Sequence, residues 1–224
     1  MKTLLVAGKG GGGKSTTAFN IAVVARRTGL RVGLIDVDPQ RSLSDMRIAR
    51  GNADIPVQAC RMEDLPEKFA LANQSRLDVL IVDTPPAIGA HTLAAIGLAD
   101  FVLLPMRPTV FDLRATRHWI NLLRSAAQPF GVIINAAPPR REGLDAPMVR
   151  DARNALHCLG INAWRSQITH RHIIPQSCIG GRGVAETDPA GPAAIEYAEL
   201  WRLILRAIEH IRSIHHEKSP SHVA

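Results

Sequence analysis

A run of glycines near the start of the chain has the residue types of a phosphate-binding loop. Gly8, Gly13, Lys14 and Ser15 match the pattern G-x-x-x-x-G-K-[ST], the P-loop of nucleotide-binding proteins. Phosphate oxygens need several N–H donors at close range, and glycine lets the backbone wrap tightly enough to supply them. We therefore expect Lys14 to bridge the β and γ phosphates and Ser15 to ligate Mg²⁺. The alternative is a flexible glycine-rich loop.

Three aspartates follow apolar segments and are candidates for holding a metal ion. Asp83 ends the apolar run Leu77–Val82, and an acid in that place beside a P-loop can hold Mg²⁺ through water. Asp36 and Asp38 are two residues apart, so both side chains can point to one side of the chain. One of them is then able to face the metal and the other the attacking water. The alternative is that the Asp-Pro pair only marks a turn.

These residues need a parallel sheet to bring them together, and the hydrophobic pattern predicts one. Apolar runs of strand length alternate with segments of helical spacing, which indicates a doubly wound α/β fold, mostly parallel and flanked by helices. The predicted strands are Leu4–Ala7, Val32–Ile35, Leu77–Val82, Phe101–Leu104, Phe130–Ile134 and a short one within 161–168. The predicted helices are 15–28, 63–74, 89–98, 112–126 with Asp112 as its cap, 145–159 and 190–214. We expect one domain over 1–214 and a disordered tail over 215–224.

Composition limits the class of protein and suggests a partner. The 224 residues carry a net charge of +7, which favours a polyanionic partner, although solubility alone would also explain it. No apolar run approaches the roughly 20 residues of a membrane span. The three cysteines, Cys60, Cys158 and Cys178, lie far apart, so we expect packed thiols in a reducing cytoplasm and no disulfide framework.

Several segments together resemble the ParA/MinD family of deviant Walker A ATPases, and most of all the small plasmid-type ParA partition proteins. Residues 9–16 are similar to the motif KGGxGK[ST]T, with Gly12 where Val or Ser is more usual. Residues 36–40 resemble the DxDPQ segment, and residues 80–86 resemble the Walker B strand. Residues 168–171 and 186–191 are similar to late segments of these proteins, so the resemblance spans nearly the whole chain.

The resemblance implies a P-loop ATPase that uses ATP and Mg²⁺, hydrolyses slowly and is stimulated by a partner. Lys9 is the signature lysine, which in this family reaches the ATP of the other subunit in a sandwich dimer. Asp38 is implied to be the hydrolytic switch, so the predicted catalytic residues are Lys9, Lys14 and Asp38. The predicted nucleotide-binding residues are Gly10, Gly11, Gly12, Gly13, Lys14, Ser15 and Thr16, with Thr16 at the α phosphate. The predicted metal-binding residues are Ser15, Asp36 and Asp83.

We interpret the chain as a cytoplasmic, nucleoid-associated ATPase that binds DNA without sequence preference and segregates a plasmid or chromosome. Basic residues on 113–141 and 140–182 suit sequence-independent phosphate contacts, although Arg114, Arg117 and Arg124 also fit a solvated helix face. Arg171 is the DNA-binding candidate because it matches a family position. The resemblance implies a homodimer on ATP binding and a ParB-like or small ribbon-helix-helix protein as the activator.

Three other functions of the same family stay open at this stage. The cargo could be a protein assembly instead of DNA. A MinD-like membrane role would need an amphipathic end helix, but the apolar positions of 200–211 favour core packing, so we expect no stable membrane association. Electron transfer, as in relatives of the nitrogenase iron protein, needs a bridging cysteine pair that Cys60, Cys158 and Cys178 do not provide.

Overall fold

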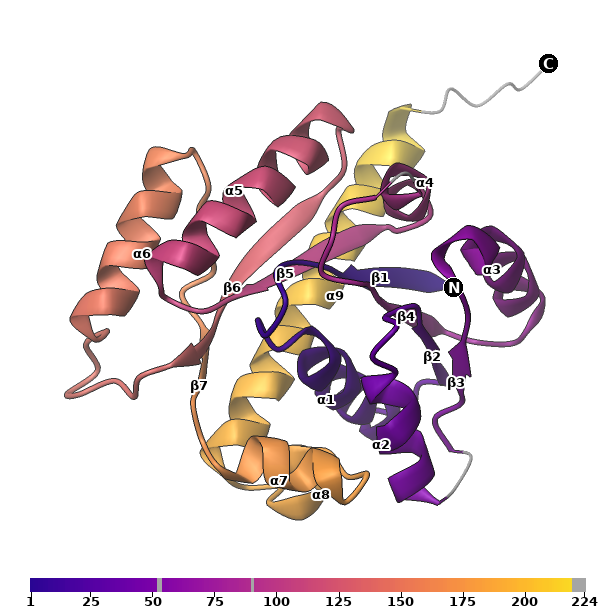
Figure 1. Ribbon diagram of the computed structural model, residues 1–224, viewed down its shortest axis with the longest axis horizontal. Coiled ribbons are helices and arrows are strands. Elements are labelled where there is room, and N and C mark those ends of the chain that lie inside the picture. The colour runs from indigo at the N-terminus through magenta and orange to yellow at the C-terminus, as the bar shows by residue number, and fades with distance from the viewer. Residues whose placement is uncertain (52–53, 90, 219–224) are drawn as a thin grey trace.

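A single seven-stranded parallel sheet forms the centre of the molecule (Figure 1). The computed structural model describes residues 1–51, 54–89 and 91–218. The strand order is β3-β2-β4-β1-β5-β6-β7, and each neighbouring pair is parallel. The strands are β1 (Lys2–Val6), β2 (Val32–Asp36), β3 (Val57–Ala59), β4 (Val79–Asp83), β5 (Phe101–Met106), β6 (Phe130–Ala137) and β7 (Gln167–Thr169). The predicted fold class is confirmed.

The central strand β1 leads directly into the glycine-rich loop that precedes α1. Its neighbours are β4 and β5. Strands β2 to β4 lie on one side of β1 and β5 to β7 on the other, so the order of the strands changes direction at β1. Ligands of open α/β sheets bind beyond the carboxyl ends of the strands at such a switch point. Val6 on β1 and Asp36 on β2 are both in register with Asp83 on β4, which brings the predicted acids to this edge of the sheet.

Helices cover both faces of the sheet because successive strand side chains point to opposite sides. On β1, Leu4 and Val6 pack into one buried cluster, whereas Leu5 and Ala7 pack into the other. The first cluster includes α1 (Lys14–Arg27), α2 (Ser42–Arg50), α7 (Ile173–Ile179), α8 (Val184–Thr187) and α9 (Pro192–Lys218). The second includes α3 (Leu65–Gln74), preceded by the 3₁₀ turn Met62–Asp64, and α4 (Thr92–Gly97), α5 (Val110–Ser125) and α6 (Pro147–Cys158).

The long helix α9 crosses behind the sheet and supplies much of the first cluster (Figure 1). Leu200, Ile204 and Ile208 are almost fully buried, and Ala207 and Ile211 pack against the same cluster while partly buried, as predicted. Leu203, also predicted to pack in the core, is only partly buried and belongs to neither cluster. Within the described ranges, no helix has the length and apolar character needed to span a membrane. The helix continues to Lys218, four residues beyond the predicted end, and 219–224 lie outside the described residues.

The structure contains four elements that the hydrophobic pattern did not predict: α2, β3, α7 and α8. α2 follows the Asp-Pro turn and buries only Leu43, so its pattern carries little helical signal. β3 has three residues, none of them buried, and α8 has four. α7 contains Pro175 in its first turn, where proline is tolerated. The predicted cap of α5 is also wrong: Thr109 is the N-cap, and its side chain accepts a hydrogen bond from the amide of Asp112 at 3.2 Å.

Candidate nucleotide-binding site

The glycine-rich loop joins β1 to α1, and several of its residues have backbone angles that only glycine adopts easily. Gly11 and Gly13 have φ angles of 73° and 88°, which side-chain-bearing residues rarely adopt. A Cβ on Gly13 would lie 2.3 Å from the side-chain nitrogen of Asn135, at the carboxyl end of β6. That Asn135 amide donates to the carbonyl of Gly12 at 2.7 Å, so β6 braces the loop. The predicted P-loop therefore has the required strand–loop–helix setting.

Helix α1 begins at Lys14 and points its amino end into this loop. Its first turn contains no acidic residue, so its open N–H groups can meet phosphate oxygens. Lys14 itself is only 6% exposed. Burial lowers the pKa of the Lys14 ammonium, and the carboxylates of Asp83 and Asp38 oppose that shift. A buried cation among carboxylates at a helix amino end is the arrangement that a polyphosphate with a metal ion requires.

Asp83 ends β4 with both carboxylate oxygens buried and without a hydrogen-bond partner among the described residues. Burial raises the pKa of Asp83 to about 7, although the neighbouring Ser15 side chain and, to a smaller extent, the charge of Lys14 oppose this shift. A buried carboxylate without partners is costly in free energy. Oxygen ligands of this kind suit Mg²⁺, which is held by one or two carboxylates together with substrate phosphates. Asp83 therefore fits its predicted role at a metal site.

Asp36 stands beside Asp83 on the neighbouring strand and is fully buried. Its Oδ2 accepts hydrogen bonds from the amide and hydroxyl of Ser44, at 3.0 and 2.8 Å, while its Oδ1 is buried without a partner in the described part of the chain. Arg41 donates to the carbonyls of Asp36 and Cys60. Asp36 thus ties the start of α2 to the sheet and keeps one buried oxygen free of hydrogen bonds from the described residues.

Asp38 occupies the turn between β2 and α2 and is 7% exposed. Its Oδ1 accepts a hydrogen bond from the amide of Gln40 at 2.9 Å, so part of its role is to shape the Asp-Pro turn. Its charge also acts on Lys14 and on Asp83. The structure therefore places Asp38 near Lys14 as well as in the turn.

Lys9 contacts its own chain. Its ammonium forms an ion pair with Asp112, in the first turn of α5. The Lys9 side chain remains 42% exposed, whereas the Asp112 side chain is 6% exposed. In a single subunit the predicted signature lysine is thus held by α5.

Arg171 is committed to a contact inside the chain. Its guanidinium group donates to both oxygens of Glu196 on α9, at 2.7 and 3.0 Å. Glu196 also accepts hydrogen bonds from the amide and hydroxyl of Thr169, at the end of β7. This network joins the last strand to the last helix. The predicted DNA contact of Arg171 would compete with it.

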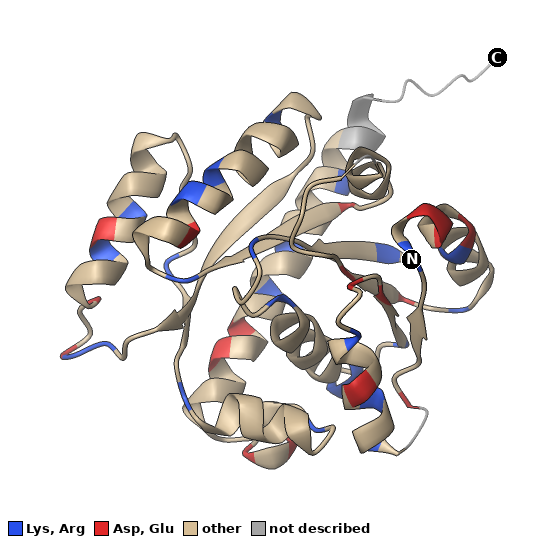
Figure 2. Cartoon of the chain, in the orientation of Figure 1, with Lys and Arg blue, Asp and Glu red and all other residues tan. Residues whose placement is uncertain are grey.

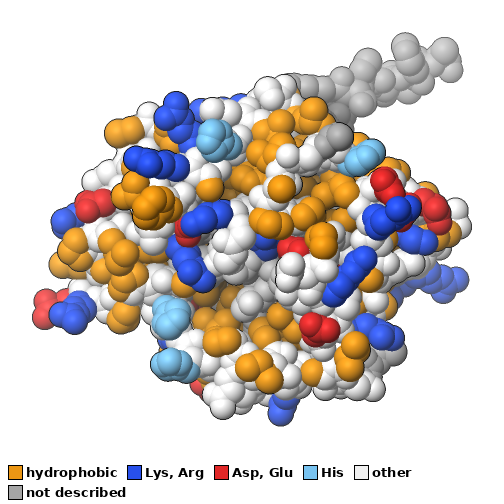
Figure 3. Space-filling model, in the orientation of Figure 1, with side chains coloured by type: hydrophobic (Ala, Val, Ile, Leu, Met, Phe, Trp, Pro, Cys, Tyr) orange, Lys and Arg blue, Asp and Glu red, His pale blue; other side chains and the backbone are white. Residues whose placement is uncertain are grey.

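Other basic side chains lie on the surface. Arg114 and Arg117 on α5 are exposed, and Arg124 donates to the carbonyl of Leu159 at 2.7 Å. Figure 2 shows basic bands along α5, and Figure 3 shows Lys and Arg side chains over the same region. Of the cysteines, Cys60 and Cys178 are buried as predicted but Cys158 is exposed, and the described residues contain no group of three or more His, Cys, Asp or Glu side chains that could hold a metal ion by themselves.

Residues 3–172 match the family model described as "CobQ/CobB/MinD/ParA nucleotide binding domain". The chain belongs to this family. The match covers the P-loop, the three aspartates and the Lys9–Asp112 pair, so the predicted resemblance to ParA and MinD is confirmed.

Two similar proteins and one solved structure can be set beside the chain. The chain is 29% identical to "Maintenance of carboxysome distribution protein A" of Halothiobacillus neapolitanus, over 87% of this chain and 91% of that protein. It is 33% identical to the protein of the same name from Gloeobacter kilaueensis, over 71% of this chain and 83% of that protein. The solved structure of the septum site-determining protein MinD from Pyrococcus horikoshii, complexed with Mg-ADP, superposes on this chain with a TM-score of 0.71. The two are 18% identical, and the superposition covers 91% of this chain and 95% of that one.

Three polar residues of this MinD/ParA-type site were not among the predicted site residues. Asn135 braces the P-loop, Ser44 binds Asp36, and Asp112 binds Lys9. Asn135 gave a usable signal, because a polar residue at the end of an apolar strand lies at the ligand edge of a parallel sheet. Ser44 and Asp112 gave none, since each is an ordinary residue in the first turn of a helix.

Proposed function

We propose that this chain is a positioning ATPase of the ParA/MinD type, which hydrolyses ATP slowly and changes its assembly with each cycle. The observation that carries the proposal is the pairing of a complete P-loop with a second lysine. Lys14 is buried beside the acids as the phosphate-binding cation, and Lys9 is half-exposed at the entrance of the same loop. The P-loop needs one lysine for its own nucleotide, so Lys9 has a separate task.

ATP and Mg²⁺ fit the residues present. The amides of Gly10–Gly13, the α1 amino end and Lys14 provide donors for the phosphates, with Thr16 at the α phosphate. Ser15, Asp36 and Asp83 are the proposed metal-binding residues, supported by the three buried oxygens of the two aspartates that lack partners in the described part of the chain. Bound Mg²⁺ would supply positive charge beside the β and γ phosphates. The Mg-ADP complex of the MinD structure supports this assignment.

Dimerisation is the proposed task of Lys9. Two subunits that face each other across their ATP molecules bring two polyphosphates close together, and added positive charge offsets their repulsion. For Lys9 to reach the ATP of a partner subunit, it must leave Asp112. Because its side chain is partly exposed, Lys9 can exchange Asp112 for a phosphate of the partner subunit's ATP.

Hydrolysis is proposed to depend on Asp38. This carboxylate lies close enough to Lys14 to influence its pKa and is anchored by the Gln40 amide, so it can orient the attacking water. We propose that the rate is low in the protein alone and that an activator, ParB-like or of the small ribbon-helix-helix kind, raises it. Arginine fingers that approach the γ phosphate provide such acceleration elsewhere.

The proposed surroundings are the cytoplasm and the nucleoid. The net charge of +7 supports non-specific DNA binding by the ATP-bound dimer. The names of the two relatives refer to carboxysome distribution, which favours a protein assembly as cargo over plasmid or chromosome partition. A MinD-like membrane anchor in the last helix is not favoured, because Leu200, Ile204 and Ile208 pack in the core.

The variant Asp38→Ala tests the proposed cycle. It should release phosphate much more slowly than the wild type while still binding Mg²⁺ and ATP, and it should remain on DNA as a dimer. Phosphate release and DNA dissociation are measured on the same sample, with the exposed Asp45→Ala on α2 as the control. Normal hydrolysis by Asp38→Ala would remove Asp38 from the mechanism. Loss of both hydrolysis and dimerisation would assign it to the Asp-Pro turn alone.

A further inference from the structure

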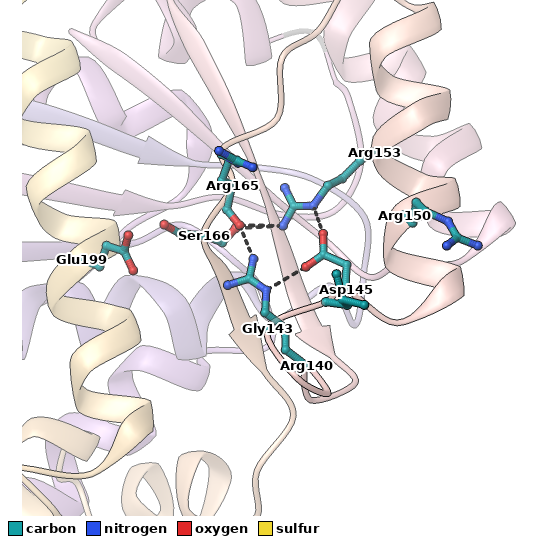
Figure 4. A pocket seen from close by; sticks show the side chains of 9 residues that line it. Arg140, Gly143, Asp145, Arg150, Arg153, Arg165, Ser166 and Glu199 are labelled. Carbon is teal, nitrogen blue, oxygen red and sulfur yellow. Dashed lines mark hydrogen bonds and ion pairs between the residues drawn. The ribbon is translucent and has the colours of Figure 1, made fainter.

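An arginine-rich cavity of about 630 Å³ lies beside β7, the edge strand of the sheet (Figure 4). Its walls come from the loop after β6, from α6, from the residues before β7 and from α9. Four arginines and two acids line it: Arg140, Arg150, Arg153, Arg165, Asp145 and Glu199. None of these residues belongs to the nucleotide-binding site described above.

Two of the arginines are fixed by a shared carboxylate. Arg140 and Arg153 donate to the two oxygens of Asp145 at 2.7 and 2.8 Å, from opposite sides. Both also donate to the carbonyl of Arg165. Arg153 is further bonded to the carbonyl of Trp164, so its donors are largely used within the fold. Asp145 and Arg153 therefore act as positioning residues that fix the loop carrying Arg140 against the segment before β7.

The remaining positive charge points outward. Arg165 and Arg150 are exposed, and neither side chain has an ion pair within the described residues. In Figure 4 the Arg165 side chain extends from the segment before β7 and that of Arg150 from the outer side of α6, on either side of the fixed pair. Arg140 keeps its Nη1 group clear of the contacts above. Asp145 offsets one arginine, and Glu199 is the other negative charge at the cavity.

We propose that this cavity and its rim form a contact surface for the phosphates of double-stranded DNA, with Arg140, Arg150 and Arg165 as the contacting residues. The inference rests on the proposed function, which includes DNA binding in the ATP-bound state. It gives that binding a location that Arg171 does not, because Arg171 is held by Glu196. Of the three contacting arginines, Arg140 is already oriented by Asp145, so it loses little conformational entropy when it binds a phosphate, whereas Arg150 and Arg165 contribute exposed charge.

The distribution of the charges favours a nucleic-acid backbone over a single free anion. The arginines of the cavity come from three separate segments, and in Figure 4 Arg165 and Arg150 lie on either side of the group formed by Arg140, Asp145 and Arg153, so the positive charge is spread along the rim. The centre of the cavity holds Asp145, which would repel a small anion placed there. A DNA strand carries regularly spaced phosphates and can contact the rim on both sides of that carboxylate.

The experiment compares three forms of the full chain with the wild type. Fluorescence anisotropy measures binding to a short mixed-sequence DNA duplex, with ATP and Mg²⁺, over a series of salt concentrations. The double variant Arg150→Gln/Arg165→Gln should bind at least tenfold more weakly, and the slope of log K against log salt should fall by about 1.8 per subunit on the DNA, since each phosphate contact contributes about 0.9. Glu199→Gln should instead bind more tightly.

A matched control removes the same charge elsewhere. Arg76→Gln/Arg206→Gln neutralises two exposed arginines, before β4 and on α9, and should keep the wild-type salt slope. ATP binding and thermal melting of all variants establish that the site and the fold are intact. If the wild type fails to bind DNA with ATP, the proposed function fails. If the wild type binds and the Arg150/Arg165 variant has the same affinity and salt slope, the assignment of this surface to DNA is wrong. If that variant also loses the stimulation of hydrolysis by an activator, the surface binds a protein partner instead.

Discussion

Asp83 is a carboxylate whose burial disfavours its charged form. Both of its carboxylate oxygens are buried without a partner in the described residues, next to the equally buried Asp36. Burial raises the pKa of Asp83 to about 7, so the carboxylate is the main form above that pH. The protein without ligands retains this cost because a bound cation would remove it. Stability and ligand binding are therefore opposed at this residue.

Asp83→Asn should separate these two effects. At about pH 8, replacing the buried carboxylate by a neutral amide should raise the free energy of unfolding of the nucleotide-free protein by about 1 kcal/mol. The added stabilisation that Mg²⁺ gives to the ATP-bound protein should disappear. Urea denaturation with and without Mg²⁺ and ATP measures both, and an unchanged Mg²⁺ effect would place the metal elsewhere.

Asp112→Asn should free Lys9 from its own chain. The ion pair has one half-exposed partner, so we expect it to hold Lys9 in the monomer with about 1 kcal/mol of free energy. Dimerisation no longer has to break this pair in the variant, so the ATP-bound dimer should become about fivefold tighter. Sedimentation equilibrium with ATP and Mg²⁺ measures this constant, with the exposed Asp151→Asn on α6 as the control. A weaker dimer in Asp112→Asn would mean that α5 supports Lys9 in the dimer as well.

At the scale of elements, α2 links Asp36 to the segment between α7 and α8. Its start is bound to Asp36 through Ser44, and its last residue, Arg50, is nearly buried. The Arg50 guanidinium donates to Asp54 and Glu186 and to the carbonyl of Gly181. The segment between α7 and α8 is thereby fixed to the helix that follows Asp38.

Arg50→Gln should destabilise the fold by about 2 kcal/mol, because it leaves two partly buried carboxylates without their cation. The matched control is Arg47→Gln, which removes an exposed arginine from the same helix. Urea denaturation should show a lower midpoint for Arg50→Gln at an unchanged slope. Equal midpoints for the two variants would show that this network adds no stability.

The sequence predicted the elements with strong apolar patterns and missed those held by polar contacts. The strands ending at Asp36 and Asp83 are continuous apolar runs, so their position and the acids after them could be foreseen. Helix α2 could not, since it depends on Ser44 reaching Asp36 and on Arg50 reaching Glu186, which is 136 residues away. The Lys9–Asp112 pair spans 103 residues and carries no local pattern.

The whole molecule presents a nucleotide site at the centre of the sheet and an arginine surface at its β7 edge. The two share no residue, so ATP binding and the proposed DNA contact can be altered separately. What couples them in the proposed cycle is the dimer, because binding to DNA in the ATP state alone requires an ATP-dependent change of assembly. Lys9 is the residue on which this proposed change of assembly depends.

The most direct test is the mass of the protein in solution, measured by light scattering with and without ATP and Mg²⁺. The wild type should double in mass when ATP is added and return to a monomer with ADP. Lys9→Ala should bind ATP with the wild-type affinity in a separate titration and remain a monomer, whereas Lys14→Ala should remain a monomer because it fails to bind ATP. A Lys9→Ala protein that doubles in mass with ATP as readily as the wild type would contradict the account, because Lys9 would then be an ordinary residue of the loop.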